Sequence, residues 1–522
     1  MRLRRVLPLG LFLAACAEAP PPAVQPPPAP PPPAPAPVAY APPIHVTPDA
    51  PFRQAAPEGG PAVTFVAPKV TEMKLGNGVR VLLVERHDLP IISVRVVAKN
   101  GAGDLSWEPP GAASLAGAML ELGTTRRTAL QISDEYEALG ATHGSWIDWD
   151  SAGASVKVTT DKIDGALDLL ADVALHPSFP AEELERVRKR RLTRIQQEKT
   201  NPHAVASNAV AAALFGRAHP YGHTLGGRTP EVEKIDRADL VRAHAVLFNP
   251  SRAAIVVAGD ITREVLQKKL EAAFGSWRAL PVPPLAHGTA RVAPPASPVP
   301  SKNAPRVILV DRPDAPQSVV QLVELGVARS APDRDAISVM NAILGGMFSS
   351  RINLNLREAH AYTYGAYSYF DERHAAGPFI AGASVKSDTT AASIGELFKE
   401  ERGIQDALAS PEELLGAKES LKLALPARFE TLDSVTEALA DLVIYDLPAD
   451  EYSSRPARID KVTAEDVQKA AKAHLHPSSV RVLVVGDRAH VEPTLEPLHL
   501  GAPEIRDAYG DPIAPAPAAA KP

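Results

Sequence analysis

The sequence has little cysteine, no long apolar run beyond its start and no excess of basic charge. Cys16 is the single cysteine among 522 residues, which excludes an internal disulfide. Beyond the extreme N-terminus, no stretch reaches the roughly 20 apolar residues that a membrane-spanning helix needs. A formal net charge of -6 gives no basic footprint for nucleic acid. The remaining composition, 45% hydrophobic and 22% charged with 53 prolines, is that of a proline-rich globular protein.

The N-terminus has the pattern of a signal peptide. Three arginines (Arg2, Arg4 and Arg5) precede a ten-residue apolar run, 6–15, which is too short to span a bilayer. The run ends Leu13-Ala14-Ala15-Cys16, which resembles a bacterial lipobox, so we expect residues 1–16 to be a lipoprotein signal and Cys16 to carry the lipid. The alternative is an ordinary secretory signal with an incidental cysteine. Ala17 in place of Asp resembles outer-membrane sorting and favours a location in the bacterial envelope, facing the periplasm.

Proline-rich stretches divide the chain. Residues 17–69 contain a Pro/Ala tract that cannot pack a core and favours extended polyproline II, so they are expected to tether the body to a membrane. A second proline-rich stretch, 281–305, is interpreted as a linker, and 501–522 as a disordered tail. Two domains remain, 70–280 and 306–500.

An internal repeat relates these two domains. Ala152-Gly153-Ala154-Ser155-Val156-Lys157 recurs at 381–386, and Gly259-Asp260 recurs as Gly486-Asp487 at nearly the same offset. So long a period indicates two homologous domains, since solenoid units have about 20–50 residues. Strands and helices do not alternate strictly, which predicts an α+β fold, a mostly antiparallel sheet backed by helices in each domain.

An ordered set of short motifs resembles the insulinase, pitrilysin and mitochondrial processing peptidase family of zinc metallopeptidases. The motifs lie at 74–81 (KLGNGVRV), 219–222 (HPYG), 344–351 (LGGMFSSR) and 356–358 (LRE). The resemblance implies that the two domains form one half of a clamshell that closes around an extended peptide. Smaller members of the family build the clamshell from two chains, so a homologous partner subunit and a peptide substrate are expected.

The zinc motif of the family is missing. Active members carry H-x-x-E-H, in which two histidines bind zinc and the glutamate is the general base. In the frame set by residues 111–124, Ser114 and Ala118 take the histidine positions and Gly117 the glutamate position. Arg194 falls at the third ligand, and no H-x-x-E-H occurs anywhere in the chain. We therefore expect no metal and no other cofactor on this chain, with zinc on the partner subunit.

The second domain keeps two residues that face the zinc site in active relatives. Arg357 and Tyr364 have the family spacing of seven. The resemblance implies that Arg357 donates to the substrate backbone and that the Tyr364 hydroxyl stabilises the oxyanion, both in trans. The alternative is structural: Arg357 pairs with Glu358, and Tyr364 fills a core slot.

Two further features have weaker implications. Gly144-Ser145 replace the Asn-Ala pair of the family's substrate-binding edge strand, which weakens peptide recruitment by backbone pairing without forbidding it. His219 and His223 have a ligand-pair spacing, but Pro220 and Gly222 favour a turn over a helix face that would align the rings.

Two functional classes follow from these observations. In the first, the chain is the zinc-less subunit of a heterodimeric metalloendopeptidase and supplies Arg357 and Tyr364. In the second, it is a lipoprotein that binds peptides or organises envelope proteins without proteolysis. Autonomous proteolysis is disfavoured, because both a metal site and a general base are missing.

The lipid anchor can be tested directly. A lipidated Cys16 with two or more acyl chains anchors stably, whereas one chain alone binds marginally. We expect Cys16→Ser to move the protein from the membrane to the soluble fraction on fractionation of the native host. Unchanged membrane retention would count against the anchor.

Overall fold

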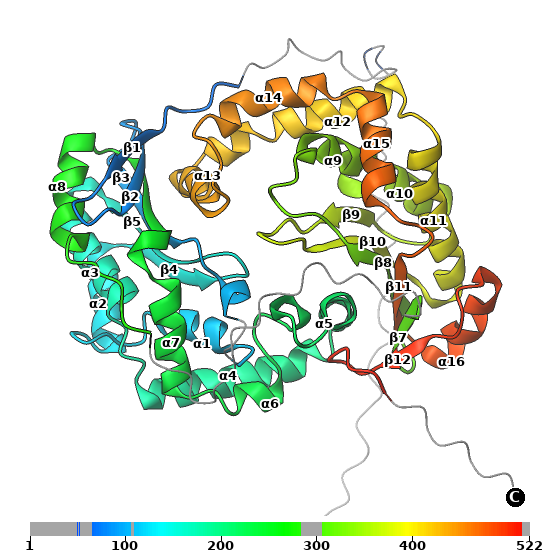
Figure 1. Ribbon diagram of the computed structural model, residues 1–522, viewed down its shortest axis with the longest axis horizontal. Helices are drawn as coiled ribbons and strands as arrows, with labels where there is room; N and C mark the ends of the chain where they lie inside the picture. Colours follow the sequence, from blue (N-terminus) through cyan, green and yellow to red (C-terminus); the bar gives the residue numbers. More distant parts are fainter. Residues whose placement is uncertain (1–49, 51, 53–64, 106–108, 283–304, 514–522) are drawn as a thin grey trace, which may run out of the picture. The chain divides into compact units, whose positions relative to one another are not determined.

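Each half of the computed structural model is built on a six-stranded sheet (Figure 1). Five strands have the same order in both sheets, whereas the sixth, at one edge, is the first strand of the chain in one sheet and the last in the other. The structure describes residues 50, 52, 65–105, 109–282 and 305–513. Residues Val63–Pro522 form one compact unit and Met1–Ala62 another, and both sheets belong to the former. The expected signal peptide (1–16) and most of the tether (17–69) and linker (281–305) lie outside the described residues.

The strands confirm the α+β class. The first sheet contains, in spatial order, β1 (Thr71–Lys74), β2 (Arg80–Glu85), β6 (Ala253–Gly259), β3 (Ile91–Ala98), β5 (Ala152–Thr159) and β4 (Thr142–Ile147). The second contains β12 (Glu504–Arg506), β7 (Val307–Asp311), β11 (Arg481–Gly486), β8 (Gln317–Leu325), β10 (Pro378–Lys386) and β9 (Ala366–Phe370). Pairing is antiparallel except for β2 with β6, β7 with β11 and β7 with β12.

The helices follow the same repeat. The first half contains α1 (Ala112–Met119), α2 (Ala129–Leu139), α3 (Ile163–Leu175), α4 (Ala181–Glu198), α5 (Pro202–Phe215), α6 (Thr229–Val232), α7 (Arg237–Leu247) and α8 (Arg263–Phe274). The second contains α9 (Arg334–Asn341), α10 (Arg351–Asn353), α11 (Thr390–Asp406), α12 (Pro411–Leu423), α13 (Leu432–Ile444), α14 (Glu451–Lys461), α15 (Ala464–His474) and α16 (Arg488–Val491). A π-helical turn follows α9 (Ala342–Gly346) and another follows α10 (Leu354–Ala359).

The same close approach of a neighbouring strand explains the glycine that recurs in both halves, Gly153 and Gly382. Gly153 of β5 and Gly382 of β10 occupy equivalent places in their sheets. A Cβ on Gly153 would lie 2.4 Å from the Val96 carbonyl oxygen, and one on Gly382 would lie 2.3 Å from that of Val320. Close approach of the neighbouring strand therefore demands glycine at both positions.

One face of each sheet packs on helices of its own half. Alternation along β2 directs Val81 and Leu83 into the core formed with α1, α3, α7 and α8. In the second sheet, Leu309 and Leu322 enter the equivalent core with α9, α11 and α15. Each half thus has its own hydrophobic core.

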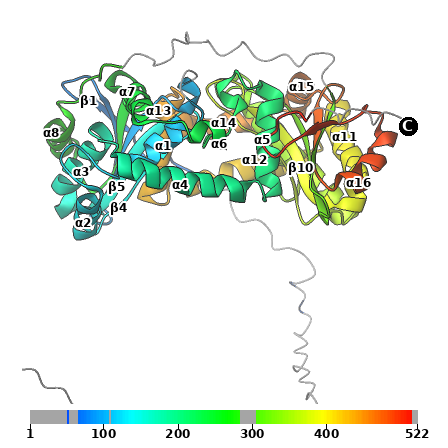
Figure 2. The ribbon, with the colours of Figure 1, turned by 90° about the horizontal axis from the view of Figure 1, so that it is seen from below.

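The opposite face of each sheet is covered by a helix from the other half. Leu82 and Val84 of β2 pack on α13, which follows in sequence long after the first sheet is complete. Conversely, α5 from the first half covers β8 and β11 of the second sheet (Figures 1 and 2). Because α5 and α13 hold equivalent places in the repeat, the two halves exchange corresponding helices.

Polar contacts fix α13 on the first sheet. Asp433, in the first turn of α13, accepts from Ser93 Oγ (3.0 Å) and from Lys157 Nζ (2.5 Å). Burial alone would raise the pKa of Asp433, but these two donors outweigh it and the pKa is lowered. Arg95 Nε donates to Thr436 Oγ1 at 2.9 Å, one turn further along α13.

The expectation of a disordered tail from residue 501 is wrong for its first part. β12 pairs in parallel with β7, and Arg217 of the first half donates to Asp511 Oδ1 at 2.8 Å. Asn208 Nδ2 of α5 also donates to the Ala508 carbonyl at 3.0 Å. The segment is therefore ordered by hydrogen bonds to its surroundings, although its sequence has little apolar character.

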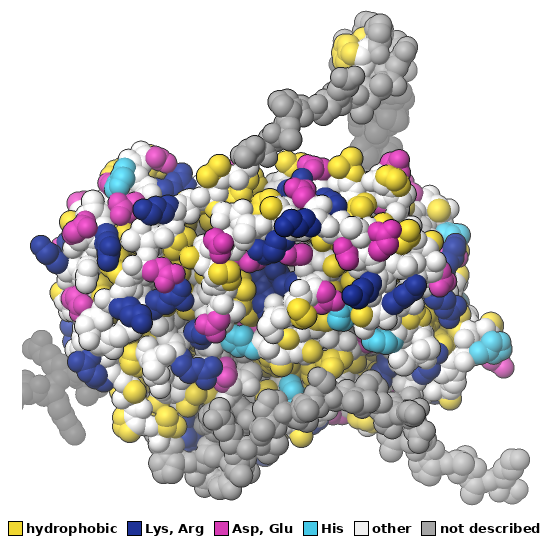
Figure 3. Space-filling view, turned by 45° about the horizontal axis from the view of Figure 1, so that its top comes forward, with side chains coloured by type: hydrophobic (Ala, Val, Ile, Leu, Met, Phe, Trp, Pro, Cys, Tyr) yellow, Lys and Arg dark blue, Asp and Glu magenta, His cyan; other side chains and the backbone are white. Residues whose placement is uncertain are grey.

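Two surface properties bear on function. Over the described residues, no helix combines the length and apolarity needed to cross a membrane. Acidic and basic side chains are interspersed over the face shown in Figure 3, with apolar side chains between them. That face offers no continuous basic surface, in agreement with the acidic net charge.

The helix exchange predicts that damage in one half spreads to the other. Leu442 of α13 is fully buried against the first sheet, so Leu442→Ala should lower the free energy of unfolding by about 2–5 kcal/mol. Hydrogen exchange should show weaker protection of β2 and β6 amides, although the substitution lies in the second half. Leu423→Ala on α12 is the control, because that side chain is 55% exposed. Unchanged protection in β2 and β6 would contradict the proposed coupling.

Candidate functional site

The three positions of the expected zinc motif lie on α1. Ser114 is half-buried, Gly117 is buried and Ala118 is exposed. Gly111, just before the helix, has φ +99° and lies so close to Gly226 that its Cβ would be 2.8 Å from the Gly226 carbonyl oxygen. The start of α1 is therefore fixed by glycine, and the register of the helix follows from it.

Gly117 is closed off by the neighbouring edge strand. A Cβ on Gly117 would lie 2.8 Å from Cγ1 of Ile147, at the end of β4. Ser145 Oγ, also on β4, donates to the Gly117 carbonyl at 3.0 Å. A glutamate at this position, where the sequence predicts the lost general base, would have to displace the Ile147 side chain.

Arg194, at the expected third-ligand position, points into solvent. Its side chain is 75% exposed and its Nε lies 3.5 Å from Glu198 Oε1, one turn along α4. The helix itself packs through Val187 and Ile195. Across the described residues, no group of three His, Cys, Asp or Glu side chains is placed to hold a metal ion. The residues of this region thus do not fit zinc.

The two histidines at ligand-pair spacing are engaged elsewhere. They flank a 3-10 turn, Pro220–Gly222. His219 Nδ1 accepts from the Tyr221 N–H at 3.0 Å, and His223 Nε2 donates to the Arg217 carbonyl at 2.6 Å. Burial lowers the pKa of both imidazoles, which favours their neutral forms. Their role here is to hold the turn.

β4, with Gly144 and Ser145, is an edge strand. Its hydrogen-bonded neighbour in the sheet is β5 alone. A Cβ on Gly144 would meet nothing within 4 Å, so this part of the strand is open. The family resemblance implied an edge strand at these residues, and the strand order confirms it.

Arg357 lies near the end of the second π-helical turn. Its guanidinium carbon is 4.6 Å from the centre of the Phe348 ring, and its Nε is 3.3 Å from Glu358 Oε1. The side chain remains 37% exposed. The structural alternative from the sequence, pairing with Glu358, is thus present, yet the guanidinium stays open to a ligand. Phe348, 65% exposed, orients Arg357, and nothing in the sequence assigned it that role.

Tyr364 stands out from an anchored loop. The ring is 94% exposed, so the alternative that it fills a core slot is wrong. On one side of it, the Tyr362 N–H donates to the Leu356 carbonyl at 2.9 Å. On the same side, Thr363 Oγ1 donates to the Ser384 carbonyl at 2.7 Å, and on the other side the Ala366 N–H donates to Asn353 Oδ1 at 3.0 Å. The loop is held on both sides while the phenol reaches into solvent.

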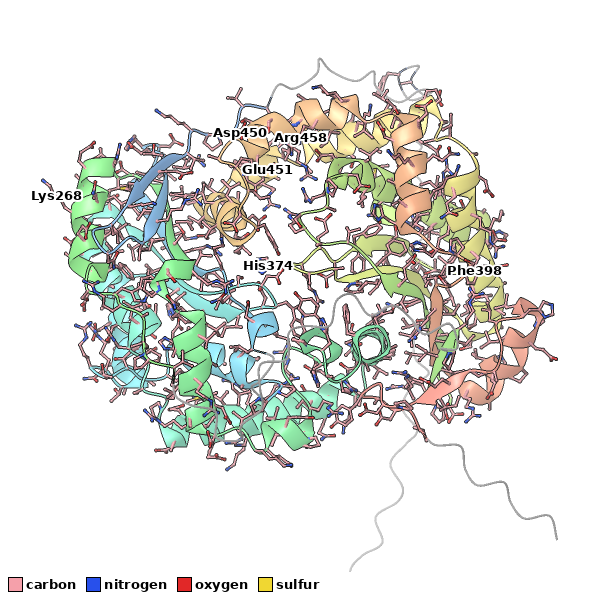
Figure 4. The ribbon with its side chains drawn as sticks, viewed as in Figure 1. Lys268, His374, Phe398, Asp450, Glu451 and Arg458 are labelled. Atoms are coloured by element: carbon pink, nitrogen blue, oxygen red, sulfur yellow. The ribbon has the colours of Figure 1, made fainter. Side chains whose placement is uncertain are left out.

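A polar cluster joins the two halves near these elements. Asp150, buried in the β4–β5 turn, accepts from Tyr221 Oη (3.2 Å) and from the His374 N–H (2.8 Å). Burial raises the pKa of Asp150. His374, labelled in Figure 4, lies between β9 and β10 and also donates through Nε2 to the Ile444 carbonyl of α13 at 2.8 Å. The sequence alone does not indicate this cluster, because its members come from four distant segments.

Comparison with known proteins agrees with this architecture. Residues 80–227 match the family described as Insulinase (Peptidase family M16), and residues 234–421 match the Peptidase M16 inactive domain. An uncharacterized zinc protease of Mycobacterium tuberculosis is 29% identical over 317 residues, covering 60% of this chain and 70% of that protein. A probable mitochondrial-processing peptidase subunit beta of Arabidopsis thaliana is 24% identical over 436 residues, 80% of this chain and 79% of that protein.

Solved structures share the fold. A peptidase M16 inactive domain from Pseudomonas fluorescens superposes with a TM-score of 0.72 at 28% identity, covering 80% of this chain and 98% of that one. A protease from Helicobacter pylori gives a TM-score of 0.70 at 17% identity over 80% of this chain and 100% of that one, a likeness of fold. With its paired sheets, its ordered motifs and matches to both halves, the chain belongs to the insulinase family of metallopeptidases, peptidase family M16.

Proposed function

We propose that this chain is the non-catalytic subunit of a heterodimeric M16 metalloendopeptidase. The observation that carries the proposal is the contrast between two surfaces. On α1, Gly117 is packed against Ile147 and the metal-ligand positions carry no ligand. On the second half, Tyr364 is 94% exposed on an anchored loop, beside an accessible Arg357.

The chemistry assigned to this chain is hydrogen-bond donation. The Tyr364 hydroxyl donates to the oxyanion that develops when the partner's active site attacks a peptide carbonyl. The Arg357 guanidinium donates to the backbone of the bound peptide, and its contact with Phe348 limits the orientations it must lose on binding. No step runs through a metal on this chain; zinc belongs to the partner subunit.

The comparisons support this assignment in two ways. A relative named as a subunit, the mitochondrial-processing peptidase beta chain, aligns over four fifths of this chain. Part of the sequence also matches a domain described as inactive, as does a solved structure of similar fold. By analogy, the partner is a homologue with an intact H-x-x-E-H motif, and the substrate is a peptide. We further propose that lipidated Cys16 holds the complex at the bacterial outer membrane.

A second candidate is a peptide-binding or scaffold lipoprotein without a proteolytic role. The open edge of β4 favours it, since an extended peptide can add to a free strand by backbone pairing. The two candidates differ in whether the native complex contains a zinc-bearing subunit. A strictly monomeric or homodimeric native species would shift the assignment to the scaffold.

Zinc content separates this chain from active members of the family. The purified chain, dialysed against trace zinc and then against buffer, should retain far less than one zinc per chain by elemental analysis. The reason is the loss of ligands at Ser114, Ala118 and Arg194. One tightly held zinc per chain would overturn the proposal.

Tyr364 and Arg357 should act on catalysis and leave assembly intact. In the complex co-purified from the native host, Tyr364→Phe should lower kcat by about 10²–10³ or somewhat less, the typical cost of losing one oxyanion donor. Arg357→Ala should also raise KM, because a donor to the substrate backbone contributes ground-state binding.

The control is Tyr362→Phe, two residues away in the same loop. Tyr362 is half-buried and packs on the second core, so its ring is retained and only its hydroxyl is lost. Peptide cleavage, zinc content and dimer yield are measured for each variant. If Tyr364→Phe and Arg357→Ala both keep full activity, the two residues have a structural role and the chain is a scaffold.

A further inference from the structure

A cavity of about 230 Å³ lies where the two halves meet. Helix α5 and the Pro220–Gly222 turn supply residues from the first half, and β9, β10 and the loop between them supply residues from the second. Its lining includes four aromatic side chains, Trp149, Phe215, Tyr221 and Tyr369. Neither the zinc-motif positions nor Arg357 and Tyr364 belong to it.

The aromatic walls are held in place before any ligand arrives. Tyr221 donates through its hydroxyl to Asp150, and its ring meets Trp149 edge-on with centroids 5.4 Å apart. Arg373 lies over both rings, 4.9 Å from Trp149 and 4.5 Å from Tyr221. Phe215 meets Tyr221 at 5.5 Å, also edge-on. Such preorganisation lowers the ordering cost of binding.

The lining carries no uncompensated charge. Arg373 Nη2 bonds Asp371 Oδ2 at 2.5 Å, so the two charges of the lining neutralise each other. Desolvation lowers the pKa of the His223 imidazole, which lines the cavity. Desolvation, together with the nearby Tyr367 and Asp371, raises the pKa of Tyr369 to about 12. Both side chains are therefore neutral near pH 7. Arg373 Nη1 is buried without a hydrogen-bond partner, so it can donate to one acceptor on a ligand. A neutral ring would gain four aromatic neighbours.

Size narrows the ligand further. An apolar protein cavity of about 150 Å³ holds benzene, so about 230 Å³ accommodates a phenyl ring with room to spare. The hydroxyls of Ser207 and Thr224 also line the cavity, and each donates to a backbone carbonyl. Their remaining lone pairs can accept from peptide N–H groups.

We propose that this cavity is a binding site for the aromatic side chain of a peptide, distinct from the Arg357 and Tyr364 site. The lining residues of this ring-binding cavity and their contacts support the binding of an aromatic ring. Only the inference that the ring belongs to a peptide rests on the proposed function. An extended peptide rises about 3.3 Å per residue. Tyr369 follows Tyr364 by five residues, so their backbones are at most about 17 Å apart, roughly the length of five extended peptide residues.

Binding to the full chain alone, without partner or cleavage, tests the proposal. The probes are acetylated, amidated pentapeptides of the form Gly-Gly-X-Gly-Gly, in which X is Phe, Ala, Lys or Glu. The readout is the tryptophan emission of the chain, assigned to the cavity by its loss in Trp149→Phe. We expect the Phe peptide to bind at least tenfold more tightly than the other three.

Variants of α5 provide the matched comparison. Ala211 lines the cavity, so Ala211→Leu should fill part of it and weaken the Phe peptide at least tenfold. Ala204→Leu, on the same helix outside the lining, should leave the affinity unchanged. Circular dichroism and thermal melting check folding, and Ser207→Leu is the second filling variant if Ala211→Leu does not fold.

Three results would overturn the proposal. The first is equal binding of all four peptides, and the second is binding that neither filling variant weakens. The third is binding of benzyl alcohol as tight as that of the Phe peptide, which would assign the cavity to small free aromatic molecules. Because no partner is present, these failures leave the subunit assignment standing. Conversely, full activity of Tyr364→Phe in the complex would not affect the cavity.

Discussion

Helices α5 and α13, which hold equivalent places in the repeat, each cover the sheet of the opposite half. Each sheet has apolar side chains on both faces, and its own helices cover one face only. Leaving the second face in water would forgo about 1.5–3 kcal/mol for each large aliphatic side chain. The polar cluster around Asp150 depends on the same arrangement, because His374 bonds both Asp150 and the end of α13. The ring-binding cavity lies at the same junction, between α5 and strands β9 and β10 of the second sheet.

Within this framework, the two surfaces that the proposed function involves, on α1 and on the Tyr364 loop, differ in packing. The α1 surface is consolidated: a small residue at 117 admits Ile147, and Ser145 bonds the helix backbone. The Tyr364 loop carries its phenol in solvent although its neighbours are firmly bonded. A large exposed aromatic ring lowers solubility, and it adds no packing energy to the isolated chain.

The sequence predicted the repeat from segments that recur, such as 152–157 at 381–386, and the α+β class from strands that do not alternate strictly with helices. The edge position of β4 was implied by the family resemblance. The sequence did not predict the helix exchange, since equivalent helices have the same pattern whichever sheet they cover. One signal was available: α5 is apolar on nearly all sides, with Val205, Val210 and Phe215 all buried, as expected of a helix enclosed by protein. β12 was missed because Glu-Ile-Arg is too short to show a period. The exposure of Tyr364 depends on tertiary packing and has no local signature.

The helix exchange also sets an order in time. When a ribosome has completed β6 at Gly259, the first sheet has all its strands, but its second apolar face has no cover until α13 ends at Ile444. Residues 260–444 therefore separate the last strand of that sheet from the end of the helix that covers it. Until α13 is complete, the nascent first half presents Leu82, Val84 and Val256 to its surroundings. A fragment that ends between the halves leaves these side chains without the cover that α13 provides.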